Sequence, residues 1–133
     1  MSHISKVETQ LKDMAILQKT LTSLGYEYEC AKENQKIQVK AYNKDTIDAD
    51  MEIKILGPYG IAVNRTKNGL ELSADWWEVE TYTERKQEDF LSEIQKQYAY
   101  ETVMDKIKAD GYSIVTENQD QEENLHIVVR RWV

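Results

Sequence analysis

The sequence predicts an α+β fold in which one antiparallel sheet of about six to eight strands carries two main helices on one face. Three observations favour this class. Short segments alternate apolar and polar side chains, two other segments place apolar residues three and four positions apart, and glycine turn signals separate them. At 133 residues the chain has the length of one common domain, so residues 1–133 are expected to form a single α+β domain.

The first elements are a strand and a helix. Alternation predicts a strand over residues 4–11, with apolar or β-branched side chains on one side. A helix follows, because Asp13 can cap its N-terminus and Gly25 can close it in the left-handed conformation. The apolar positions of this helix recur at helical spacing and are Met14, Leu17, Leu21 and Leu24.

The middle of the chain indicates a meander of antiparallel strands. Strands are expected over residues 26–30, around residues 37–41 and 51–55, and on both sides of the tight Asn68-Gly69 turn. The last of these strands runs from residue 70 toward residue 79. Trp76 and Trp77 would then face opposite sides of a strand, and residues 80–88 would form a polar loop.

A long helix and a final pair of strands complete the expected fold. Helical spacing predicts the helix from about residue 88 to 109, with Gly111 closing it. Strands are expected over residues 112–115 and 125–132, joined by an acidic loop. Because both faces of the final strand are apolar, it is expected inside the sheet or covered on both sides.

Two short segments resemble each other. Leu24-Gly25-Tyr26 and Asp110-Gly111-Tyr112 each follow a helix and precede a predicted strand–loop–strand hairpin. This similarity favours a pseudo-repeat of helix–Gly–Tyr–hairpin units packed on one sheet, although a glycine after a helix is common enough for coincidence to stay open.

Composition excludes several classes of protein. The chain has 24 acidic and 17 basic residues and a formal net charge of −7, which argues against nucleic acid as the main partner. One cysteine excludes an intrachain disulfide, and no apolar run approaches the roughly 20 residues of a membrane span. The first residues lack a signal-peptide core, so we expect the protein to act where it is made.

Few residues are suited to catalysis. His3 and His126 are the two histidines, and Cys30 is the one thiol. We expect Cys30 to be a buried strand cysteine and His126 to have a pairing or packing role. No phosphate-binding glycine loop, Cys-x-x-Cys pair or His-Glu-x-x-His helix occurs, so no catalytic or cofactor-binding residue is assigned and a non-enzymatic protein is favoured.

The densest carboxylate cluster does not predict a metal site. Its members are Asp45, Asp48, Asp50 and Glu52. A calcium loop of the EF-hand type needs a glycine at its sixth position and a glutamate at its twelfth, and the cluster has neither. From Asp48 onward its acids alternate with apolar residues instead, which is typical of a solvated strand face.

Aromatic and arginine residues favour a binding surface. Large aromatic side chains and arginine are enriched at the centres of protein interfaces. The candidate interaction surface is Trp77, Tyr98, Tyr100, Arg130, Arg131 and Trp132. The alternative that most of these residues are core or edge residues stays open.

Three segments carry a resemblance to a known family. They are the opening MSHIS with the following TQLKD and LG, the helix segment KQYAYETV, and the ending HIVVRRW. Together they resemble the plastid and cyanobacterial reading-frame family Ycf-thirty-five, whose domain is called domain of unknown function twelve fifty-seven. Ile4 and Gln97 depart from the usual Phe and Arg, and residues 45–88 match less closely.

The resemblance implies a compartment and no activity. A member would act in the chloroplast stroma or the cyanobacterial cytoplasm. Related bacterial genes are often near genes for AAA-type ATPases, which implies an accessory role and such an ATPase as partner. The resemblance carries over no catalytic residue.

Two functional hypotheses from different classes follow. The first is a non-enzymatic accessory module that binds a protein partner through the candidate interaction surface. The alternative is a small-molecule-binding protein or an enzyme with a pocket between the long helix and the sheet, lined by Tyr98, Trp77 and His126. Self-association through an exposed sheet edge stays open as a third possibility.

Overall fold

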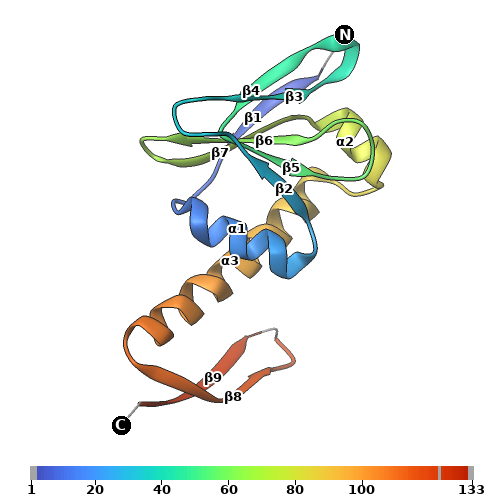
Figure 1. The fold of residues 1–133 in the computed structure, drawn as a ribbon. Coiled ribbons are helices and arrows are strands. Elements are labelled where there is room, and N and C mark those ends of the chain that lie inside the picture. Colours follow the sequence, from blue (N-terminus) through green and yellow to red (C-terminus); the bar gives the residue numbers. More distant parts are fainter. Residues whose placement is uncertain (1–2, 123, 132–133) are drawn as a thin grey trace. The chain divides into compact units, whose positions relative to one another are not determined.

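The computed structural model describes residues 3–122 and 124–131 and confirms the α+β class (Figure 1). Its chain divides into two compact units, an N-terminal unit of Met1–Tyr98 and a C-terminal unit of Ala99–Val133. The strands are β1 (Ile4–Glu8), β2 (Glu27–Cys30), β3 (Ile37–Lys40), β4 (Thr46–Ala49), β5 (Met51–Lys54), β6 (Ile61–Thr66), β7 (Gly69–Asp75), β8 (Tyr112–Gln119) and β9 (Leu125–Arg131). The helices are α1 (Met14–Leu24), the 3₁₀ turn η1 (Tyr42–Lys44), α2 (Trp76–Thr83) and α3 (Gln87–Ala109).

The central sheet has five antiparallel strands in the order β1-β7-β6-β5-β2. The expectation of six to eight strands in one sheet was wrong, because β3 pairs with β4 in a separate two-stranded sheet and β8 pairs with β9 in another. The tight turn at Asn68-Gly69 is confirmed, since it joins β6 directly to β7. The meander therefore folds into two layers rather than one wide sheet.

Strand β6 is buried on both faces, which explains the layering. Ile61 and Val63 belong to the main core with side chains of α1 and α3. Ala62 points to the opposite face and packs with Val39 and Ala49 of the β3–β4 hairpin. The helices thus cover one face of the sheet and the hairpin covers the other (Figure 1).

Asp50 turns the chain from the hairpin into the central sheet. Its carboxylate accepts hydrogen bonds from the Lys36 ammonium at 2.8 Å and from the Arg65 backbone N–H at 2.8 Å. Burial acts to raise the pKa of Asp50, but these two donors outweigh it and lower the pKa below its usual value. The carboxylates around residues 45–52 therefore do not form one solvated strand face, because Asp50 fixes a corner between two sheets.

Helix α1 ends where the local sequence predicts. The Asp13 carboxylate accepts hydrogen bonds from the backbone N–H groups of Ala15 and Ile16, and Gly25 closes the helix at φ 85°. The helix–Gly–Tyr joint is confirmed here and after α3, where Gly111 has φ 82°. The prediction that residues 26–30 and 37–41 pair as the hairpin of the first repeat was wrong, because β2 pairs with β5 and β3 pairs with β4.

Helix α2 occupies a segment expected to be a strand and a loop. Asp75 ends β7 and caps α2, since its carboxylate accepts a hydrogen bond from the Glu78 backbone N–H at 3.4 Å. An aspartate followed three positions later by a glutamate is a helix-start signal that competes with the strand pattern. Trp76 is consequently buried, whereas Trp77 is 60% exposed.

Helix α3 begins against α2. The Gln87 backbone N–H donates to the Glu80 carboxylate at 2.7 Å, so a side chain of α2 caps the start of α3. Phe90 and Ile94 bury one side of its first half in the main core. None of the helices in the described part of the chain is both long and apolar enough to cross a membrane.

The C-terminal unit contains the end of α3 and the β8–β9 hairpin. Strand β8 is longer than expected, and the register shifts by one residue between Ile114 and Thr116. The expectation that the final strand is covered on both sides was wrong. Among the described residues β9 pairs only with β8, and Leu125, Val128 and Val129 are exposed.

Two glycines with positive φ provide a test of the fold. Gly57 has φ 103°, and a Cβ added there would lie 2.7 Å from Cβ and 2.6 Å from Cγ of Tyr82. Rotation of the Tyr82 ring does not relieve a contact with its own Cβ. Gly25 has φ 85° but nothing within 4 Å of an added Cβ.

We therefore predict that Gly57→Ala destabilises the protein more than Gly25→Ala. Backbone strain alone should reduce the free energy of unfolding by about 1 kcal/mol in Gly25→Ala. Strain plus overpacking should reduce it by about 3 kcal/mol in Gly57→Ala. Urea denaturation followed by circular dichroism measures both values, and equal losses would contradict the packing of the residue 55–60 loop against α2.

Candidate functional site

A buried carboxylate organises one end of the N-terminal unit. Asp75 is fully buried. Its Oδ2 atom accepts hydrogen bonds from the backbone N–H groups of His3, at 3.2 Å, and Tyr42, at 3.3 Å, while Oδ1 accepts from that of Glu78. Since one oxygen binds both His3 and Tyr42, the start of β1 and the turn of the β3–β4 hairpin lie next to each other.

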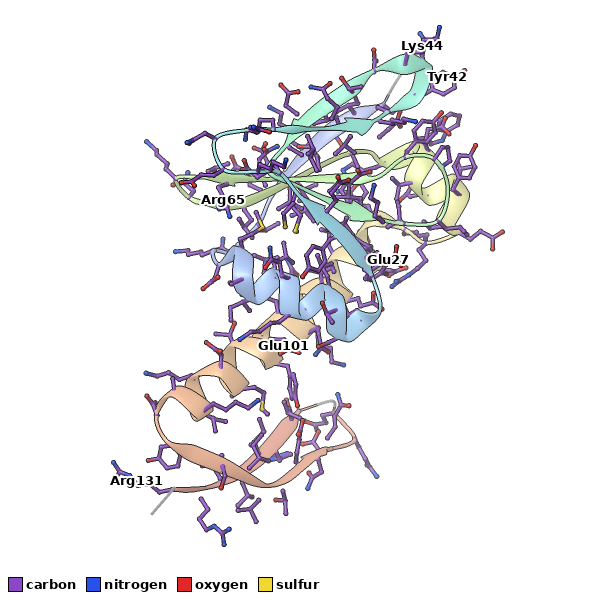
Figure 2. All side chains as sticks on the ribbon, in the orientation of Figure 1. Glu27, Tyr42, Lys44, Arg65, Glu101 and Arg131 are labelled. Carbon is purple, nitrogen blue, oxygen red and sulfur yellow. The ribbon has the colours of Figure 1, made fainter. Side chains whose placement is uncertain are left out.

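Five ring-bearing side chains surround this carboxylate, and we call them the aromatic surface. They are His3, Tyr42, Tyr59, Trp77 and Tyr82. The His3 and Trp77 rings lie 5.0 Å apart between centroids, and the Tyr59 and Tyr82 rings lie 6.0 Å apart with their planes at 70°. Figure 2 shows Tyr42 at the end of the hairpin, where its ring points outward.

Tyr59 lies close to Tyr82, Tyr42 and the Asp75 carboxylate. Burial raises the pKa of its hydroxyl, and the charge of Glu78 raises it further. Tyr82, Tyr42 and the Asp75 carboxylate also act on this hydroxyl. The exposed fractions are 60% for Trp77, 44% for Tyr82 and 42% for Tyr42. Large aromatic side chains this exposed and this close together are typical of an interface rather than of isolated surface residues.

A small apolar cavity lies on the other side of α2. It has a volume of about 160 Å³ and is bounded by α2, the start of α3 and the residues after β5. Its walls include the buried side chains of Trp76, Val79 and Phe90. The lining residues are Tyr26, Ile55, Leu56, Trp76, Val79, Thr83, Arg85, Lys86, Gln87 and Phe90.

A charged triad holds the mouth of this cavity. The Arg85 guanidinium donates to the Tyr26 hydroxyl and to the Glu93 carboxylate, both at 3.0 Å, and the Tyr26 hydroxyl donates to the same carboxylate at 2.9 Å. Burial raises the pKa of Tyr26, and its hydrogen bond to Glu93 raises it further. The triad therefore holds the Tyr26 hydroxyl in place at the mouth.

The sequence-predicted residues are divided between the two units, with Trp77 and Tyr98 in the N-terminal unit. Trp77 lies in the aromatic surface. Tyr98 is half-buried, and its hydroxyl accepts hydrogen bonds from the backbone N–H groups of Lys12, at 3.3 Å, and Asp13, at 2.9 Å. That hydroxyl therefore joins α3 to the start of α1. The cavity is not lined by Tyr98, Trp77 or His126.

The other predicted residues belong to the C-terminal unit. Tyr100 is half-buried and forms a hydrogen bond with the Glu117 side chain. Arg130 pairs in register with Ser113, and Arg131 pairs with Tyr112; both arginines are exposed (Figure 2 labels Arg131). Trp132 lies outside the described residues. The interaction surface as a whole stays a prediction.

The other candidate reactive residues, Cys30 and His126, each form a hydrogen bond with a neighbouring side chain. The expectation of a buried Cys30 was wrong, because its side chain is exposed at the end of an edge strand and accepts a hydrogen bond from Gln18 at 3.0 Å. His126 pairs with Asp120 at 2.8 Å, which agrees with the pairing role. Over residues 3–122 and 124–131, no three His, Cys, Asp or Glu side chains form a group that could hold a metal ion.

The sequence contains a local signal beside each site. The Asp75-x-x-Glu78 helix start would have separated Trp76 from Trp77 by one helical step, about 100°, rather than by the two faces of a strand. Gly57 beside Pro58 and Tyr59 indicated the tight loop. The contact of that loop with Tyr82 depends on α2 and has no local signal.

The comparisons with known proteins give the family. A model of the family "Protein of unknown function (DUF1257)" matches residues 20–128. The chain belongs to this family. The matched residues include Asp75, helix α2 and every residue that lines the cavity, whereas His3 and the end of β9 lie outside the match.

Three relatives are similar over nearly their whole length. "Uncharacterized protein ycf35" of Cyanophora paradoxa is 28% identical over 134 residues, which cover 99% of this chain and 98% of the relative. The ycf35 proteins of Pyropia yezoensis and Guillardia theta are 24% and 29% identical over 132 and 140 residues, with the same coverage. These relatives support a plastid origin. No solved structure matches the chain.

We predict that Tyr100 titrates anomalously. The hydrogen bond to Glu117, followed by burial and the charge of that carboxylate, raises the pKa of Tyr100 to about 12. Because the folded-state pKa is above the unfolded value of about 10, this contribution to stability is complete below pH 10 and is lost as the pH rises through 12. In Glu117→Gln the pKa should fall toward 10.

The measurement is an NMR titration of the tyrosine Cζ signals, with Tyr100→Phe to assign the signal. The seven other tyrosines of the chain provide internal references. An unchanged titration of Tyr100 in Glu117→Gln would show that the hydroxyl is not held by Glu117.

Proposed function

We propose that this protein is a non-enzymatic accessory module that binds a protein partner through the aromatic surface. The observation that carries the proposal is Trp77, which is 60% exposed at the start of α2 and whose ring lies 5.0 Å from that of His3. Trp and Tyr residues supply much of the binding energy of protein interfaces when they fill pockets on the partner. The Asp75 carboxylate binds the backbone N–H groups of His3 and Tyr42, so the backbone that carries these two rings is held in place before the partner binds.

The β8–β9 hairpin is proposed as a second contact region. It exposes Val115, Leu125 and Val128 beside Arg130 and Arg131. Apolar side chains next to arginines have the composition of an interface centre with its charged rim. Arg130 and Arg131, which the sequence predicts as part of the interaction surface, therefore belong to this second proposed region.

The compartment and the partner class are part of the same proposal. The plastid relatives support action in a chloroplast stroma or in a cyanobacterial cytoplasm. An AAA-type ATPase is the proposed partner class, on family association alone, so the test includes arms with and without ATP.

We predict that Trp77→Ala weakens partner binding without unfolding the protein. A tagged chain is used to recover partners from a plastid or cyanobacterial extract, with and without ATP, and the partners are identified by mass spectrometry. An interface anchor of this kind contributes about 2 kcal/mol, so recovery at limiting concentration should fall roughly thirtyfold. Tyr42→Ala should also weaken recovery, because it removes another exposed ring of the aromatic surface. It should leave the fold intact, since alanine keeps the backbone N–H that binds Asp75.

Val103→Ala is the matched control, because it also removes an exposed apolar side chain, 45% exposed, at a distant position in the sequence. Its recovery and the melting temperatures of all variants should equal those of the wild type. Equal recovery by Trp77→Ala would refute the aromatic surface as the docking site. A loss confined to Arg130→Ala/Arg131→Ala would move the site to the hairpin.

A further inference from the structure

We propose that the cavity beside α2 is a binding site for a small organic anion with a compact apolar body, such as an aromatic or branched aliphatic carboxylate. This site is independent of partner binding at the aromatic surface. The two sites use different faces of α2, because Trp76 and Trp77 differ in direction by about 100° around the helix axis.

The size and walls of the cavity define the apolar body of the ligand. An apolar cavity of about 150 Å³ is large enough to bind benzene, and this cavity measures about 160 Å³. Phe90 lies at the centre of its aromatic wall, with ring centroids 5.5 Å from Tyr26 and 6.2 Å from Trp76. A ring or a branched chain of similar volume would therefore contact aromatic side chains on several sides.

The charges at the mouth define the polar end of the ligand. The ten lining residues include two cations, Arg85 and Lys86. The neighbouring carboxylates of Glu93 and Glu80 already accept hydrogen bonds from lining residues, Glu93 from Arg85 and Tyr26 and Glu80 from the Gln87 backbone. Arg85 is already paired with Glu93, so the exposed Lys86 is the cation placed to bind an incoming carboxylate.

The mouth is also held in shape without a ligand. The Tyr26–Glu93–Arg85 triad fixes one rim, and the Glu80 carboxylate fixes the first N–H of α3. The short turn between α2 and α3 is fixed by the left-handed Glu84, at φ 58°. A site already formed in this way loses little conformational freedom when a small molecule binds.

The test is a titration with phenylacetate followed by ¹H–¹⁵N NMR of the full chain. The indole N–H of Trp76 is a suitable reporter, because the side chain lines the cavity and its Nε1 donates to the Ser5 carbonyl at 3.2 Å. We expect saturable shifts of the Trp76 indole and of the Phe90 amide, with a Kd on the order of 1 mM for so small a ligand. Phenylacetamide, which has the same shape and no charge, should bind about fivefold more weakly.

Three variants separate the parts of the proposal. Ile55→Phe puts a ring into the cavity and should abolish the saturable shift. Lys86→Gln should weaken phenylacetate binding about fivefold, to the level of phenylacetamide. Lys67→Gln removes an exposed lysine from the β6–β7 turn and serves as the matched control, which should bind as the wild type does.

Each outcome decides one point. Saturable shifts that are lost in Ile55→Phe, in a variant whose other resonances are unchanged, support the cavity as the site. The absence of saturable shifts in the wild type overturns the proposal. Equal affinities for phenylacetate and phenylacetamide overturn its anionic part, and equal weakening in Lys86→Gln and Lys67→Gln overturns the role of Lys86.

Discussion

The buried carboxylate of Asp75 is the interaction on which the N-terminal unit depends. A buried carboxylate is costly unless hydrogen bonds replace its water, and here the backbone N–H groups of His3, Tyr42 and Glu78 do so. These donors come from the start of β1, the turn of the β3–β4 hairpin and the first turn of α2. The carboxylate thus joins the end of β7 to an edge strand, to the covering hairpin and to a helix, and it fixes the place where the aromatic surface forms.

Helix α2 gives this unit two different surfaces from two adjacent tryptophans. Successive helical residues differ by about 100° in direction, so Trp76 faces the core and the cavity while Trp77 faces solvent. On a strand the same pair would have given one buried and one exposed ring without the cavity, which needs the turn from α2 into α3. The cap that Asp75 provides therefore decides both the docking surface and the shape of the small-molecule site.

Capping and turn residues predicted the ends of helices and the tight turns, but they could not predict which strands pair across the sequence. Asp13 and Gly25 end α1 because capping needs only neighbouring residues. The alternation from Asp48 onward indicated one strand face, but Asp50 divides the segment between two sheets through contacts with Lys36 and Arg65. Of the sites, Trp77 was predicted from residue type. The cavity was not, since its walls come from the residue before β2, the residues after β5, helix α2, the turn that follows it and the start of α3, whose proximity only the folded chain defines.

The most direct test of this account compares the same substitution at two helix caps. Asp75→Asn removes one of two carboxylate oxygens that both accept hydrogen bonds, whereas Asp13 accepts through Oδ1 alone and asparagine caps helices equally well. Asp75→Asn should lower the free energy of unfolding by about 3 kcal/mol and speed amide hydrogen exchange at His3 and Tyr42. Asp13→Asn should change stability by less than about 0.5 kcal/mol. Equal stability of the two variants, with unchanged exchange at both amides, would contradict the central role of Asp75.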